Sequence, residues 1–90
     1  MARYLVERTF PEGLIIPPND DGATIVRGIV DAYAGDGVTW VHSYVSEDKR
    51  TTYCVFESPN PEAIRRVSEA NDFPVDRILK VGMLDPYPYR

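Results

Sequence analysis

The segment from residue 38 to residue 57, VTWVHSYVSEDKRTTYCVFE, constrains the fold of this chain more than any other segment. In both of its halves, side chains of different character alternate with a period of two, which is the pattern of β-strands. Between the halves lies a short charged turn, EDKR. Strands joined by so short a turn pair antiparallel, so the segment predicts a β-hairpin.

The turn also predicts the register of this hairpin. With Asp48 and Lys49 as the central residues, Tyr44 lies opposite Tyr53. One face then carries large aromatic and polar side chains: Trp40, His42, Tyr44, Tyr53, Val55 and Glu57. The other face carries a smaller, mostly apolar set: Val41, Ser43, Val45, Thr52, Cys54 and Phe56. A one-residue slip would mix the two sets. However, Asp-Lys lacks the Gly that two-residue turns favour, so a longer loop or a bulge that moves His42 opposite Cys54 remains an alternative.

The segments on either side of the hairpin complete a regular order of elements. Strands are predicted over residues 3–10 and 77–84, and helices from about residue 20 to 34 and from 61 to 70. Asn19-Asp20-Asp21-Gly22 supplies N-capping side chains for the first helix, and Asn60 is a good N-cap for the second. Gly35-Asp36-Gly37 is predicted to end the first helix, because Gly tolerates a left-handed C-cap. The order β-α-β-β-α-β predicts an α+β, ferredoxin-like fold in one domain, residues 1–90, with both helices on one face of a four-stranded antiparallel sheet.

Three details follow from single residues. In the first strand, the side chains of Tyr4, Val6 and Arg8 alternate with those of Leu5, Glu7 and Thr9. Because burying either Arg8 or Glu7 is costly, the sequence does not decide which of the two sets faces away from the helices. Gly82 predicts a bulge or the close approach of another backbone. The prolines of the tail, residues 85–90, exclude a helix, and its tyrosines suggest packing on another surface, such as a second subunit.

Composition narrows the class of partner. The net charge of −4 and the pI of about 4.8 argue against nucleic-acid binding, which needs a basic surface. No apolar run approaches the roughly 20 residues that span a bilayer, and the N-terminus lacks a signal-peptide core. A single Cys excludes an internal disulfide. We therefore expect a cytoplasmic protein without nucleic-acid or membrane partners, and a homodimer that covers the aromatic sheet face.

The candidate site lies on that aromatic face. His42 is the only His, and its imidazole suits a divalent transition metal or a general base. Tyr53, Glu57 and Glu7 are the neighbouring donors that would complete a metal site. The alternative is a half-buried His that is hydrogen-bonded at a dimer interface. Cys54 is interpreted as a small buried hydrophobe, and no catalytic residue is predicted.

At this point the chain resembles a known family. The segments that carry the resemblance are VERTFPEGL, WVHSYVSEDKR, TTYCVFESPNPEAIRR and FPVDRI with a closing LDP. They are similar to small bacterial proteins catalogued as a domain of unknown function, some of which are described as nickel-binding. The resemblance implies a ferredoxin-like fold, dimers that pack sheet on sheet, and nickel or another divalent transition metal, with no established reaction.

The family's motif carries over onto four residues: its strand His matches His42, its Tyr-Cys pair matches Tyr53 and Cys54, and its strand-end Glu matches Glu57. One departure is Val67, where many relatives carry a His.

Two other functions compete with metal binding. In the first, the dimer is an α/β-barrel enzyme of the monooxygenase or isomerase kind. His42 then acts as acid or base on a small aromatic compound, in a ligand pocket walled by Trp40 and Tyr44. In the second, the chain is a non-catalytic interaction module.

Overall fold

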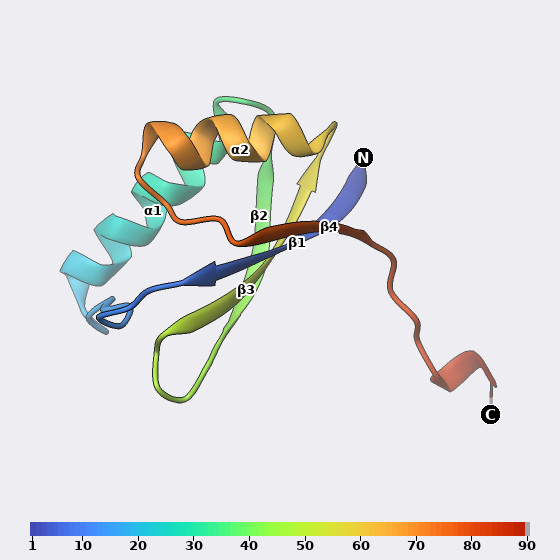
Figure 1. Cartoon of the computed structure of the whole chain (residues 1–90), viewed down its shortest axis with the longest axis horizontal. Helices are drawn as coiled ribbons and strands as arrows, with labels where there is room; N and C mark the ends of the chain where they lie inside the picture. Colours follow the sequence, from blue (N-terminus) through green and yellow to red (C-terminus); the bar gives the residue numbers. More distant parts are fainter. Residues whose placement is uncertain (90) are drawn as a thin grey trace.

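The computed structural model describes residues 1–89, and of Tyr89 only the backbone. Its strands are β1 (Ala2–Thr9), β2 (Thr39–Val45), β3 (Thr51–Ser58) and β4 (Arg77–Val81), and its α-helices are α1 (Asp20–Ala34) and α2 (Pro61–Ala70). A short 3₁₀ helix, η1, covers Tyr87–Tyr89. The sheet has the order β2-β3-β1-β4 with antiparallel pairing throughout. Both helices lie on one side of it (Figure 1), which confirms the ferredoxin-like α+β prediction.

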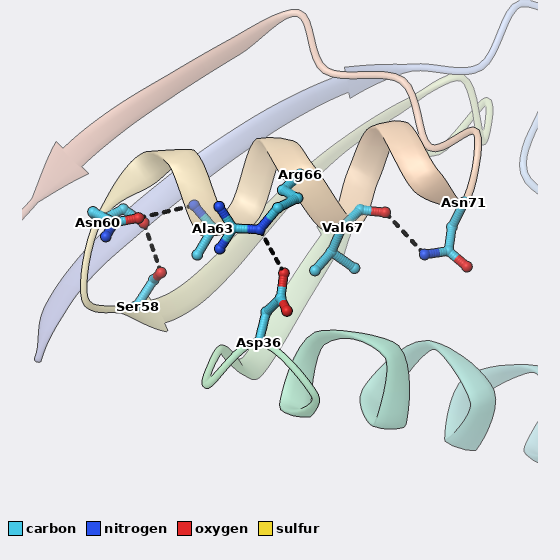
Figure 2. A network of polar contacts seen from close by, with 7 residues as sticks. All are labelled: Asp36, Ser58, Asn60, Ala63, Arg66, Val67 and Asn71. Atoms are coloured by element: carbon cyan, nitrogen blue, oxygen red, sulfur yellow. Dashed lines mark hydrogen bonds and ion pairs between the residues drawn. The ribbon is translucent and has the colours of Figure 1, made fainter.

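The helices begin where the capping residues predict. The Asn19 side chain accepts hydrogen bonds from the backbone N–H groups of Asp21 and Gly22 at 3.1 and 3.2 Å. The Asn60 side chain accepts one from the N–H of Ala63 at 2.9 Å (Figure 2). These bonds satisfy backbone donors that have no partner inside the helix.

The helix α1 ends at the predicted Gly35-Asp36-Gly37 segment. Gly35 itself has φ −58° and stays right-handed. The left-handed residue is Gly37, with φ +74°. The chain therefore makes one more turn, in which the Val38 N–H donates to the Tyr33 carbonyl at 3.0 Å, before β2 begins.

Two polar contacts fix α2 (Figure 2). At its end, Asn71 Nδ2 donates to the Val67 carbonyl at 2.9 Å. On its side, Arg66 Nε donates to Asp36 Oδ2 at 3.0 Å, which ties α2 to the turn after α1. The two helices are thus linked at the surface as well as through the core.

The core lies between the sheet and the helices. Its most deeply buried large side chains are Val6, Tyr33, Val38, Phe56 and Ile64. Not all apolar side chains of α1 enter the core: Ile25 and Val30 remain 44% and 41% exposed. Ile25 instead lines a cavity under the helix.

Two predictions for the C-terminal segment are wrong. The last strand, β4, ends at Val81 and does not continue to residue 84. Gly82 therefore lies outside the strand and forms no bulge in it, and a Cβ on Gly82 would have nothing within 4 Å, so no other backbone approaches it closely. The chain then runs away from the sheet to η1 (Figure 1), whose first N–H, on Tyr87, donates to the Asp85 carboxylate at 3.0 Å. The prolines exclude an α-helix but allow this single 3₁₀ turn.

The hairpin keeps the predicted register at its turn although the loop is longer than predicted. Tyr44 pairs with Tyr53, and Ser46 N–H donates to the Thr51 carbonyl at 2.9 Å. The loop therefore contains four residues, 47–50, in place of a two-residue turn. Lys49 takes the left-handed conformation, φ +66°, that Gly would otherwise supply.

Gly22 is buried where α1 meets the connector after β1. A Cβ at this position would overlap the Pro17 carbonyl oxygen, whereas a Cβ on Gly28, in the same helix, would meet nothing within 4 Å. We expect Gly22→Ala to lower the free energy of unfolding by about 1–3 kcal/mol, because backbone must move. Gly28→Ala should raise it by about 0.5–1 kcal/mol. Urea unfolding followed by circular dichroism measures both, and equal effects would contradict the packing at Gly22.

Candidate metal site on the open sheet face

The open sheet face is the side of the sheet that carries no helix. Strand pairing arranges its side chains in three rows, each running from β2 through β3 and β1 to β4. The rows are Tyr44–Tyr53–Glu7–Arg77, His42–Val55–Leu5–Leu79 and Thr39–Glu57–Arg3–Val81. The structure thus brings His42, Tyr44, Tyr53, Glu57 and Glu7 onto one face, while their role as metal or ligand contacts remains a prediction.

His42 lies on β2, at the edge of the sheet, with its side chain exposed. Its ring meets Tyr44 edge to face, with centroids 5.2 Å apart and planes inclined by 80°. The imidazole is therefore in contact with an aromatic neighbour while it stays accessible to solvent.

The predicted position of Trp40 on the open face is wrong. A β-bulge between Trp40 and His42 places Trp40 opposite Phe56, so its ring packs against the core on the helix side. There the indole Nε1–H donates to Ser43 Oγ at 2.8 Å. The extra residue in β2, Val41, reverses the alternation of side chains between the two faces. No Gly or Pro in this stretch of the sequence indicates a bulge.

Both carboxylates on the open face are paired with arginines of neighbouring strands. Arg3 Nη2 lies 2.8 Å from Glu57 Oε1, and Arg77 Nε lies 3.4 Å from Glu7 Oε2. The hydrogen bond from Arg3 lowers the pKa of Glu57 below its usual value. Each carboxylate on this face therefore already has a cationic partner within the subunit.

One subunit does not assemble a closed metal site from these residues. Among residues 1–89, no group of three or more His, Cys, Asp or Glu side chains is placed to hold a metal ion. Glu7 is two strands away from His42 and in the next row, so at least about 10 Å away at the usual strand spacing. Glu57 is a diagonal neighbour, roughly 7–8 Å away. Within residues 1–89, neither of these carboxylates therefore lies directly beside His42.

Cys54 and the chain's apolar cavity lie on the opposite side of the sheet. Cys54 is buried, and its Sγ–H donates to Thr52 Oγ1 at 3.6 Å, in line with its interpretation as a buried hydrophobe. A cavity of about 250 Å³ lies between α1, the connector after β1 and the sheet. His42 does not line it, so it offers no apolar pocket for acid–base catalysis by that residue. Its lining residues are Arg8, Phe10, Leu14, Ile15, Ile16, Ile25, Ile29, Tyr33, Trp40, Ser43, Val45, Thr52, Cys54, Phe56 and Phe73.

Arg8 is the one charged member of that lining, and the sequence left its side open. It is 4% exposed and shares the helix side with Tyr4 and Val6. The alternation of Arg8 with two apolar residues of the same face already indicated the helix side. The cost of burying a guanidinium argued against that side, because the acceptors that offset this cost come from segments distant in the sequence.

These features define a small ferredoxin-like α+β protein with an open sheet face that carries the chain's only His. No helix within residues 1–89 is long and apolar enough to cross a membrane. The family model described as "Nickel responsive protein SCO4226-like" matches residues 4–81, and the chain belongs to this family. This result confirms the resemblance inferred from the sequence.

The same fold is found in a solved structure. The crystal structure of SCO4226 from Streptomyces coelicolor A3(2) matches with a TM-score of 0.70 and 21% identity. The match covers 93% of this chain and all of that chain, and at this identity it shows the fold alone. Curated protein sequences gave no match.

Removal of the Arg3 partner should raise the pKa of Glu57. Because the folded pKa lies below the usual value, this ion pair stabilises the fold above the normal titration range of Glu. That stabilisation is lost as the pH falls through the lowered pKa. In Arg3→Gln we expect the NMR titration midpoint of the Glu57 carboxyl to move upward toward its ordinary value. Arg77→Gln is the matched control and should leave it in place; an unchanged midpoint in Arg3→Gln would contradict the assignment.

Proposed function

We propose that this protein is a nickel-binding homodimer in which two open sheet faces pack together and His42 of each subunit binds the metal at their interface. The observation that carries the proposal is the position of His42: it is exposed on the unpartnered face, beside Tyr44, and belongs to no group of three or more His, Cys, Asp or Glu side chains among residues 1–89 that could hold a metal. The family's description as nickel responsive supports the choice of metal.

The composition of the open face supports self-association. Leu79 and Tyr53 are each 39% exposed, and Tyr44 is 63% exposed. Apolar and aromatic side chains that gather on one face are typical of the cores of protein interfaces. The charged residues of this face are held in the pairs Arg3–Glu57 and Arg77–Glu7, so a partner that covers them meets little net charge.

A symmetric dimer also supplies the donors that one subunit lacks. In an isologous interface every residue occurs twice, so one His42 meets a second imidazole or the phenols of the other subunit. Imidazole nitrogen is a good ligand for Ni²⁺. Glu57 and Glu7 are less available, because a metal would have to compete with their arginines.

The Val67 departure does not weaken this proposal. Val67 is 5% exposed and lies on α2, within the core on the helix side of the sheet. A donor at this position would therefore be separated from His42 of the same subunit by the sheet itself.

Calorimetric titration of metal-free protein with Ni²⁺ tests the site. We expect His42→Ala to weaken binding by about a hundredfold or more, since even the loss of outer-shell partners costs about 10–100-fold. Cys54→Ala is the matched control and should bind as the parent does, because Cys54 is buried on the other side of the sheet. Undiminished binding in His42→Ala, or its loss in Cys54→Ala, would reject His42 as the ligand.

The dimer is tested on a pair of equally exposed apolar residues. Leu79 lies on the open face and is 39% exposed, whereas Val30 lies on α1 and is 41% exposed. Light scattering should give a dimeric mass for the parent and for Val30→Lys. It should give a monomeric mass for Leu79→Lys, because the interface would bury an unpaired ammonium. A parent monomer would overturn the proposal.

A further inference from the structure

Arg8 places a buried guanidinium in the wall of the apolar cavity. Within the part of the chain that the structure describes, the ion pairs involve Arg3, Arg66 and Arg77, so no carboxylate pairs with Arg8. Its hydrogen-bond acceptors are neutral: Pro74 O at 2.7 Å, Tyr33 Oη at 2.7 Å and Ser68 Oγ at 3.4 Å. A buried cation normally pairs with an anion.

The guanidinium also keeps unused donors. Its described hydrogen bonds come from Nη1 and Nη2, so at least two of its five N–H groups, Nε–H among them, have no acceptor within residues 1–89. No fully enclosed side-chain nitrogen in this range lacks a partner, so Nε is in contact with accessible space. Because Arg8 is also one of the residues that line the cavity, a ligand there lies within reach of the guanidinium.

The rest of the cavity is almost entirely apolar. Ile29 and Phe10 wall it together with Trp40, and the polar groups nearby are engaged: Ser43 accepts from Trp40, and Tyr33 bonds Arg8. Ile15 and Val45, which are 82% and 44% exposed, line its outer part and mark the route to solvent.

We propose that this cavity binds a small monocarboxylate with an aliphatic or aromatic body, whose carboxylate pairs with Arg8. A planar carboxylate matches the fork of a guanidinium, and a single anionic charge balances the single cation present. A phosphate dianion would leave one negative charge unbalanced in an apolar wall. The volume of about 250 Å³ lies below the ~300–1,000 Å³ of drug-sized ligand sites and limits the body to a small one.

The proposed site is independent of nickel binding. Arg8 and the cavity lie on the helix side of the sheet, whereas His42 lies on the open face. Ni²⁺ should neither compete with the carboxylate nor be needed for its binding, so the two proposals fail separately.

Trp40 provides a direct readout, because it is the only Trp in the chain and lines the cavity. Titration of metal-free protein with sodium octanoate should change its fluorescence to saturation. The uncharged isostere octanamide should bind roughly tenfold to a hundredfold more weakly, as expected for loss of a charge-assisted contact. Equal affinity for the two compounds, or no saturable response to octanoate, would overturn the proposal.

Variants locate the binding site. Val45→Trp fills the exposed end of the cavity and leaves the guanidinium in the chain; its octanoate affinity, read by calorimetry, should fall by about tenfold or more. Arg8→Met should lose the preference for octanoate over octanamide, and Arg8→Lys should keep part of it. Arg66→Gln, which removes a surface arginine, is the matched control and should bind normally. Should Arg8→Met fail to fold, Val45→Trp still decides: octanoate binding at the parent's affinity would place the site elsewhere and reject the cavity.

Discussion

The buried guanidinium of Arg8 is the contact on which the arrangement of this fold depends. From β1 it reaches Tyr33 on α1, Ser68 on α2 and the carbonyl of Pro74 in the segment before β4. It also lies over the Phe56 and Phe73 rings, 5.7 and 5.9 Å from their centroids. Three segments distant in sequence are thereby bound to the centre of the sheet by one side chain, in a place where an aliphatic residue would bind none of them directionally.

This placement also decides what the other face carries. Because side chains alternate along a strand, Arg8 on the helix side puts Leu5 and Glu7 on the open face. There Glu7 meets Arg77, and every described carboxylate on that face has a cationic partner. The sheet thus separates two environments: an open face whose charges cancel, and an interior whose single cation faces an apolar cavity.

Features fixed by local chemistry were predictable from the sequence, and features fixed by distant contacts were not. The caps at Asn19 and Asn60 and the Tyr44–Tyr53 pairing follow from neighbouring residues, and all three are confirmed. The bulge that turns Trp40 inward has no local marker, since the gain comes from packing against Phe56 and from the Ser43 hydrogen bond. The side on which Arg8 lies stayed undecided for the same reason: its hydrogen-bond acceptors lie 25, 60 and 66 residues away in the sequence.

The isolation of His42 within its own subunit has a thermodynamic consequence for the proposed dimer. A metal whose ligands come from both subunits binds the dimer and not the monomer, so the metal and the dimer stabilise each other by linkage. Above the dissociation constant for nickel, each tenfold increase in the free nickel concentration would then add about 1.4 kcal/mol to the stability of the dimer. In the proposed dimer, one imidazole per subunit would therefore make assembly responsive to the metal without any change in the fold.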